Sequence, residues 1–351
     1  MGANFRSDNV TGAHPAILKA IADANAGPAT PYGNDGITQR LQARFDDIFE
    51  TKTAVFPVAT GTAANALSLA AAVPAWGAVY CHASSHVLLD ECNAAEFYTG
   101  GARLVALEGA HGKIAPETLE AALKSALKGV HHAQPAAVTI TQLSEAGAAY
   151  APDHVRALSR IAHKRGLTLH MDGARFANAL VGLGCSPAEI TWRAGLDILS
   201  FGATKNGAIA AEAIVVFKKD LAESLGYRRK RAGHLFSKMR FLSAQLEAYL
   251  TGDLWLKNAR HANKQAKRLA DGLGKIRGVK TAHPVEGNEV FAEMPVALAK
   301  KLEKSGFAME TWASESGSGG ARTLQRLVAA FNTDPKDVDA LIAAAHKRKP
   351  A

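Results

Sequence analysis

Two short stretches decide the fold: LTLHMDGAR, at residues 167–175, and ILSFGATKNG, at residues 198–207. Each begins as an apolar run and ends on small or polar residues, a pattern typical of a buried strand followed by a turn. Asp172 closes the first run, and Lys205 follows the second. Because open α/β sheets bind ligands at the carboxyl ends of their strands, we expect this carboxylate and this amine to lie close together.

A carboxylate and a lysine on neighbouring strand ends are what a pyridoxal phosphate enzyme requires. The lysine holds the aldehyde of the cofactor as a Schiff base, and the acid pairs with the protonated pyridine nitrogen. Each residue alone has an ordinary explanation, since an Asp at a strand end is often a helix cap and a Lys after a strand is often solvated. Asp172 and Lys205 together predict a cofactor site.

The surrounding pattern predicts an α/β fold with a mostly parallel sheet. We expect strands at residues 54–58, 78–82, 103–107, 136–141, 167–171, 197–201 and 213–217, with helices such as 117–127 and 153–164 between most of them. Alternating strands and helices favour a parallel sheet covered by helices on both faces. The strand at 213–217 follows its predecessor too closely for a crossover helix, so we expect it to run antiparallel.

A second, smaller domain is expected after the sheet. Long helices are predicted at residues 232–250 and 254–273, followed by strands near 279–282, 290–293, 307–312 and 323–329 and a last helix at 335–347. We therefore predict a large domain over residues 1–250, including the N-terminal segment, and a smaller α+β domain over residues 251–351.

An anion site is predicted after the strand at 54–58, where the chain reads ATGTAANALSLAAA. A small, flexible turn lets backbone N–H groups approach an anion, and the helix that begins there adds the positive end of its dipole. Gly61, Thr62 and Ala63 are therefore our candidates for holding a phosphate. Gly-Thr turns such as TGTAAN are common before Ala-rich helices, so this pattern alone is weak. Its position ahead of Asp172 and Lys205 is what favours a phosphate site.

Composition places the chain among soluble globular proteins. Of its 351 residues, 48% are hydrophobic and 21% are charged. Cys81, Cys92 and Cys185 lie far apart without a CxxC pair, so neither a disulfide framework nor a metal site is suggested. The sequence shows no signal peptide, and its most apolar region, at residues 63–79, is interrupted by polar residues and by Pro and Gly. We expect a cytoplasmic protein that does not enter a membrane.

The net charge of +9 raises the alternative of a nucleic-acid-binding protein. Basic residues gather at 227–231 (YRRKR) and at the end (HKRKPA), without interleaved aromatic residues or a known binding motif. A site for phosphate and carboxylate ligands also favours positive potential, so we expect no nucleic-acid partner. A nicotinamide dehydrogenase is disfavoured because no GxGxxG follows an early strand.

Several segments together resemble one family. They are RSDNVTG at residues 6–12, YGND at 32–35, TGTAAN at 60–65, the His86 segment, MDGAR at 171–175, SFGATKNG at 200–207 and RLVAAF at 326–331. Their wording and order are similar to the fold-type I pyridoxal phosphate enzymes and, within them, to the L-threonine aldolases of the β-eliminating-lyase group.

This resemblance implies an activity and an assembly. The implied activity is cleavage of L-threonine, L-allo-threonine and related β-hydroxy-α-amino acids such as phenylserine to glycine and an aldehyde. The implied assembly is a homo-oligomer, a dimer-based tetramer with shared active sites. The nearest alternative is a β-eliminating lyase or another pyridoxal phosphate enzyme on the same scaffold, which would release pyruvate and ammonia.

The resemblance also implies roles for residues around the cofactor. His86 would stack on the pyridine ring, and Arg175 would donate to the ring hydroxyl oxygen. At the position of Glu145 some family members carry a His near the substrate hydroxyl, so the general base stays open. A carboxylate can serve as a base if burial raises its pKa toward neutrality, whereas an exposed Glu145 would serve poorly.

Substrate contacts are implied by three further segments. Ser7 would lie near the substrate carboxylate, and Tyr32 would reach the site across a subunit boundary. Arg326 in RLVAAF would make a bidentate contact with the substrate carboxylate, with Arg322 as its rival.

Overall fold

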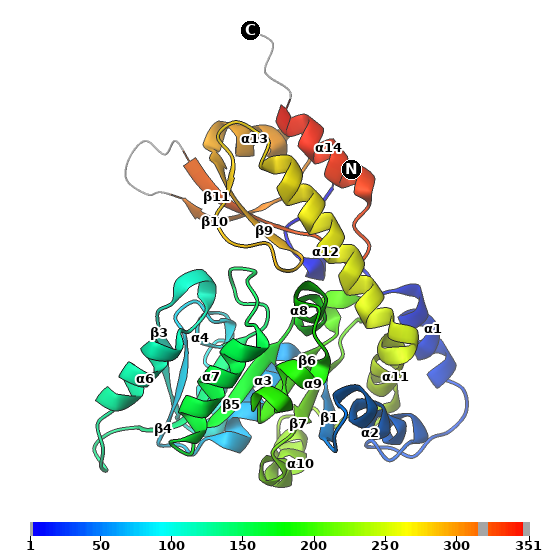
Figure 1. The fold of residues 1–351 in the computed structure, drawn as a ribbon. Coiled ribbons are helices and arrows are strands. Elements are labelled where there is room, and N and C mark those ends of the chain that lie inside the picture. Colours follow the sequence, from blue (N-terminus) through cyan, green and yellow to red (C-terminus); the bar gives the residue numbers. More distant parts are fainter. Residues whose placement is uncertain (1–2, 315–321, 347–351) are drawn as a thin grey trace.

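The computed structural model describes residues 3–314 and 322–346 and contains two sheets (Figure 1). The larger sheet has seven strands in the order β1-β7-β6-β5-β4-β2-β3, and the smaller has four in the order β10-β11-β9-β8. Of the basic cluster expected at the end of the chain, the residues after His346 lie outside the described part.

The large sheet is mostly parallel, as predicted. Its strands are β1 (Ala54–Val58), β2 (Gly77–His82), β3 (Arg103–Leu107), β4 (Gln134–Thr141), β5 (Thr168–Gly173), β6 (Ile198–Gly202) and β7 (Glu212–Val216). Strands β3, β2, β4, β5 and β6 pair in parallel. Strand β7 is antiparallel to both of its neighbours, β6 and β1, which confirms the prediction made for residues 213–217.

Helices cover both faces of this sheet. They are α1 (Pro15–Ala24), α2 (Gly36–Phe49), α3 (Gly61–Ala72), α4 (His86–Leu89), α5 (Ala94–Thr99), α6 (Pro116–Ser125), α7 (Pro152–His163), α8 (Phe176–Leu183), α9 (Pro187–Ile190), α10 (Ala222–Arg231) and α11 (Arg240–Leu250). Alternate strand residues face opposite cores: Met171 and Leu199 pack with α2 and α7, whereas Ile198 packs with α3. Such two-sided burial explains why the strands are apolar throughout.

The helix predicted at residues 232–250 is wrong in its first part. Helix α10 ends at Arg231, and α11 begins only at Arg240. Gly233 adopts a φ of +77°, a left-handed conformation that ends a helix and that glycine adopts without steric cost.

The smaller sheet is antiparallel and comprises β8 (Lys280–Thr281), β9 (Glu289–Pro295), β10 (Glu310–Ser314) and β11 (Arg322–Val328). It packs with α12 (Leu254–Leu273), α14 (Pro335–His346) and α13 (Val296–Lys304), and the last of these was not predicted. Helix α12 runs from the large sheet to the small one (Figure 1).

The N-terminal segment packs against this smaller sheet. The Phe5 side chain is buried with Leu269 and Leu327, and its backbone N–H donates to the Ala308 carbonyl at 2.8 Å. The division of the chain at residue 250 stays a prediction. Within the described residues, no helix has the length and apolar character needed to cross a membrane.

The contact between the two sheet systems yields a stability prediction. Helix α8 passes so close to the loop before β9 that a Cβ on Gly182 would collide with the backbone carbonyl oxygen of Glu286. Backbone cannot move aside as a flexible side chain does, so Gly182→Ala should destabilise the protein by about 1–3 kcal/mol. Thermal unfolding followed by circular dichroism should show a lower Tm.

Gly226 in α10 is the matched control, because a Cβ there would meet no atom within 4 Å. Gly226→Ala should leave the Tm unchanged or raise it, since alanine favours helix more than glycine by about 0.5–1 kcal/mol. A Gly182→Ala protein as stable as the wild type would contradict the close approach.

Candidate active site

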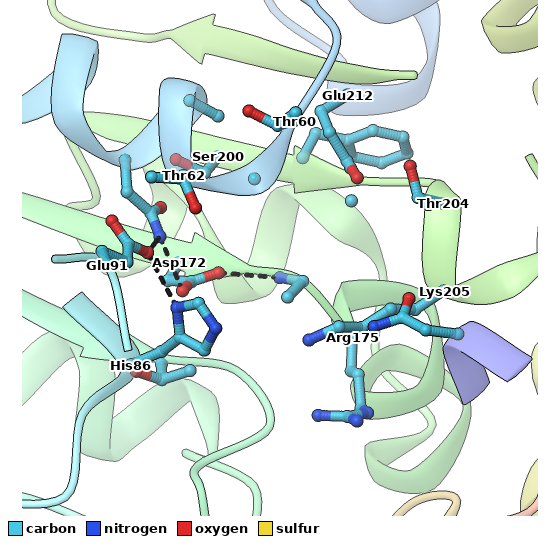
Figure 2. Close-up of a pocket in the computed structure, with 18 of the residues that line it drawn as sticks. Thr60, Thr62, His86, Glu91, Asp172, Arg175, Ser200, Thr204, Lys205 and Glu212 are labelled. Atoms are coloured by element: carbon cyan, nitrogen blue, oxygen red, sulfur yellow. Dashed lines mark hydrogen bonds and ion pairs between the residues drawn. The ribbon is translucent and has the colours of Figure 1, made fainter. Parts of the chain in front are cut away.

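A cavity of about 320 Å³ lies at the carboxyl ends of β5 and β6 (Figure 2). Asp172 enters it from the end of β5, and Lys205 from the short 3-10 turn η4 (Thr204–Asn206) that follows β6. The structure therefore brings the two residues at the centre of the sequence argument into one cavity, where open α/β sheets bind their ligands.

Asp172 is held by hydrogen bonds on both carboxylate oxygens. Its Oδ2 accepts from Asn65 Nδ2 at 2.8 Å, and its Oδ1 accepts from the backbone N–H of Ala174 at 3.0 Å. Because β5 alternates, Asp172 points to the face covered by α3, which carries Asn65. The Asp172 carboxylate is buried, and these two donors fix its orientation in the cavity.

The amine of Lys205 lies among carboxyl groups. Its charge lowers the pKa values of Asp8, Glu145, Glu212 and Glu289, although burial raises the pKa of each of these groups. No described residue makes a hydrogen bond or an ion pair with the Lys205 side chain, which lines the cavity. The amine is therefore available to a ligand.

The start of α3 supplies donors for an anion. Thr60 caps this helix, and its Oγ1 accepts from the backbone N–H of Ala63 at 3.1 Å, so that donor is occupied. Gly61 and Thr62 line the cavity, and within the described part of the chain no acceptor takes their backbone N–H groups. Of the three residues predicted from TGTAAN, Gly61 and Thr62 therefore line the cavity with donors that an anion could use, and Ala63 does not line it.

His86, the first residue of α4, lines the cavity beside Asp172 (Figure 2). Its Nδ1 lies 2.9 Å from Glu91 Oε1, and its backbone N–H donates to Glu145 Oε1 at 3.2 Å. The hydrogen bond to Glu91 raises the pKa of His86, and the nearby charges of Asp172 and Glu145 act in the same direction.

Two carboxyl groups in the cavity wall have pKa values near neutrality. Burial raises the pKa of Glu145 to about 7, an effect that the charges of Asp172 and Glu289 reinforce. Burial likewise raises the pKa of Glu212 to about 7, although Glu212 accepts a hydrogen bond from the backbone N–H of Ala203 at 2.8 Å. Perturbed acids in a concave site are typical of functional residues.

Arg175 is engaged by acids rather than free. Its Nε and Nη2 donate to the two oxygens of Asp8 at 2.8 and 3.0 Å, and its Nη1 lies 3.3 Å from Glu289 Oε2. Burial alone would raise the pKa of Asp8, but the charges of Arg175 and Lys205, together with hydrogen bonds from Arg175 and Asn288, hold that pKa below its usual value. Arg175 still lines the cavity, and its donation to the ring hydroxyl oxygen stays a prediction.

Besides Ala63, three of the predicted residues do not line the cavity in this chain. Ser7 caps the 3-10 turn η1 (Asp8–Val10) by accepting from the Asn9 N–H at 3.1 Å. Tyr32 is 46% exposed, with its ring 4.5 Å from the amine of Lys230. Arg326, on β11, donates to the Arg6 carbonyl at 3.2 Å.

The two rival arginines differ in their surroundings. Arg322 forms an ion pair with Glu293 and donates to the Gly278 carbonyl at 3.0 Å. The Arg326 guanidinium lies 4.7 Å from the Trp312 ring centre, and its buried Nε has no hydrogen-bond partner in the described part of the chain. Arg326 therefore keeps donors for a further group, whereas Arg322 is already paired.

Sequence reasoning missed several acids and one amide of the site: Asp8, Asn65, Glu91, Glu212 and Glu289. Two of them stood in segments that had been singled out, Asp8 in RSDNVTG and Asn65 in TGTAAN. An acid at the start of the apolar run EAIVV was the available signal for Glu212.

Comparison with known proteins identifies the family. A family model described as beta-eliminating lyase matches residues 4–297. Low specificity L-threonine aldolases from Pseudomonas aeruginosa and another Pseudomonas strain are each 44% identical over 319 residues, covering 91% of this chain and 91% of each relative.

Solved structures of related enzymes have the same fold. A threonine aldolase from Leishmania major has a TM-score of 0.91 and 26% identity, covering 97% of this chain and 98% of its own. A serine palmitoyltransferase from Sphingomonas wittichii, at 15% identity and a TM-score of 0.71, covers 98% of this chain and 86% of its own, and shares the fold. The predicted fold-type I architecture is confirmed, and this chain belongs to the beta-eliminating lyase family.

Proposed function

We propose that this protein is a pyridoxal phosphate-dependent L-threonine aldolase of low specificity. It cleaves L-threonine, L-allo-threonine and related β-hydroxy-α-amino acids, phenylserine among them, to glycine and an aldehyde. The observation that carries the proposal is one cavity holding Asp172 and Lys205 in a chain that is 44% identical to low specificity L-threonine aldolases.

The donors and acceptors of the cavity fit pyridoxal phosphate. Lys205 offers an amine without a described partner, and Asp172 offers a fixed carboxylate for the pyridinium nitrogen. The free N–H groups of Gly61 and Thr62 at the start of α3 fit a phosphate. When bound, the cofactor supplies an electron sink for the bond that breaks at the α-carbon.

The protein's own residues would bind the substrate and move its protons. His86 borders the cavity beside Asp172 and is the candidate to cover the cofactor ring (Figure 2). Glu145, with its pKa near 7, is the candidate to accept the proton of the β-hydroxyl group. Arg326 is the candidate to hold the substrate carboxylate, and its charge already acts on Glu289 beside Arg175.

The assembly and compartment are part of the proposal. A homo-oligomer, a dimer-based tetramer, would let Tyr32 contribute to the cavity of a neighbouring subunit, which is consistent with its exposure here. Ser7 would approach the substrate from the N-terminal segment, one residue from Asp8. A cytoplasmic location is consistent with the free thiols of Cys81, Cys92 and Cys185.

The reaction itself is tested by its products. The purified enzyme should form glycine and the matching aldehyde from L-threonine, L-allo-threonine and phenylserine, and leave the D-isomers untouched. Lys205→Ala should form none. Pyruvate and ammonia as the main products, with no glycine, would defeat the aldolase assignment and favour a β-eliminating lyase.

The role of Glu145 predicts a pH dependence. A carboxyl group whose pKa is raised to about 7 is an active base above that pH and is protonated below it. The plot of kcat/KM against pH should therefore fall on the acid side with a midpoint near 7. Glu145→Gln should lose this limb and lower kcat by about 10²–10⁴-fold. Glu117→Gln, on the exposed side of α6, is the control. An unchanged limb in Glu145→Gln would assign the base elsewhere.

The two arginines of β11 can be compared directly. Arg326→Ala should lower kcat/KM by roughly 2–4 kcal/mol in transition-state stabilisation, because a charged bidentate contact is lost. Arg322→Ala, on the same strand, should change kcat/KM far less, since its partner is Glu293. The opposite order of effects would show that Arg322 anchors the substrate.

A further inference from the structure

Four side chains form a continuous hydrogen-bonded series along the cavity: His86, Glu91, Asn65 and Asp172 (Figure 2). His86 Nδ1 lies 2.9 Å from Glu91 Oε1. Asn65 Nδ2 donates to the same Glu91 oxygen at 2.8 Å and to Asp172 Oδ2 at 2.8 Å. A single amide nitrogen therefore joins the carboxylate at the end of β5 to the acid that holds the imidazole.

The hydrogens of this series can be assigned by counting donors and acceptors. An amide NH₂ group carries two hydrogens, and both go to carboxylate oxygens here. If the Asn65 amide were flipped, its oxygen would face the two carboxylate oxygens of Glu91 and Asp172, which are also acceptors. The orientation with Nδ2 toward both acids is therefore the one that forms hydrogen bonds. When Glu91 is ionised, its Oε1 accepts from both Asn65 and His86, which places a hydrogen on Nδ1. Nε2, on the side of the ring away from Glu91, stays free.

Glu91 is an unusual residue to bury. Its side chain is 0% exposed, and its second oxygen, Oε2, has no hydrogen-bond partner in the described part of the chain. An isolated buried carboxylate is costly unless a cation balances it, and His86, whose side chain is 37% exposed toward the cavity, is the titratable group in contact with it. Burial raises the pKa of Glu91, and the hydrogen bond with Glu91 raises that of His86.

We propose that Glu91 is a positioning residue for this reaction. It fixes His86 with the hydrogen on Nδ1 and Nε2 free, and through Asn65 it ties the imidazole to Asp172. This proposal rests on the proposed function and adds two residues, Glu91 and Asn65, that act through others. The imidazole of His86 and the carboxylate of Asp172 are thereby held as one unit.

A purely structural role for Glu91 is the competing explanation, because Glu91 follows the one-turn helix α4 and could serve only to anchor it. The two explanations differ in whether the negative charge of Glu91 matters for His86. An anchor needs the shape of the side chain, whereas the proposed role needs its negative charge. The charges that act on His86 are Glu91, Asp172 and Glu145, and Glu91→Gln changes one of them while preserving its shape.

The test is the titration of His86 in the holoenzyme. Hydrogen exchange at the ring carbon between the two nitrogens follows imidazole protonation, and mass spectrometry of peptides resolves it for each histidine. In the wild type, the His86 midpoint should lie above the ordinary value of 6.5. In Glu91→Gln it should fall, and kcat for glycine formation should drop by at least about tenfold with a small change in KM.

Two further variants sharpen the test. Glu96→Gln, in α5 and outside the cavity wall, is the matched control and should leave both the His86 midpoint and kcat unchanged. Asn65→Ala should lower kcat while the His86 midpoint stays above 6.5, because it cuts the link to Asp172 but leaves the bond between His86 and Glu91.

The proposal would be overturned if Glu91→Gln left the titration midpoint of His86 unchanged. A wild-type midpoint at or below 6.5 would also overturn it, and that measurement needs no variant to fold. If the wild type forms no glycine, the proposed function fails. The His86 titration would still show whether Glu91 controls the imidazole, so the two failures are distinguishable.

Discussion

The buried ion pair between Arg175 and Asp8 joins three parts of the chain that are far apart in sequence. Asp8 belongs to the N-terminal segment, Arg175 follows β5, and Glu289, the third member, begins β9 of the smaller sheet. Asn288 Nδ2 also donates to Asp8, at 3.0 Å. Removing one member would leave a buried charge without its partner, which is far costlier than losing a surface pair. The alignment of both sheets with the cavity therefore depends on this cluster.

The cavity has the opposite charge balance to the protein as a whole. The chain carries +9, yet acids outnumber bases around the site, where Glu91, Glu145 and Glu212 all have raised pKa values. Crowded carboxyl groups in a poorly solvated space cannot all ionise, so some retain protons near neutral pH. Such groups can take up and release protons at physiological pH, which suits a reaction that moves protons at several substrate atoms.

The strands of the large sheet could be predicted from the sequence because they are buried on both faces and are therefore apolar throughout. Strands β1 and β3 occur at the predicted residues, and β7 runs antiparallel as its short connection required. Asp172 and Lys205 could be found because a strand end positions each of them. Glu91 and Glu289 could not, since nothing in their local sequence distinguishes them from solvated acids. Their burial arises only when segments distant in the chain pack together. The helix predicted at residues 232–250 began too early, because Gly233 lies in the turn after α10 and α11 starts only at Arg240.

The position of Phe5 has a consequence for biosynthesis. Its partners in the smaller core include Leu269 and Leu327, so the segment around Phe5 has no place to pack until the chain has been synthesised as far as β11. The large sheet, which ends at β7, can assemble earlier because its strands all lie upstream. Until β9 and β11 emerge, the N-terminal segment lacks its backbone partners at Ala308 and Val328. Completion of the smaller core, and with it the shielding of Asp8, must therefore be a late event of synthesis.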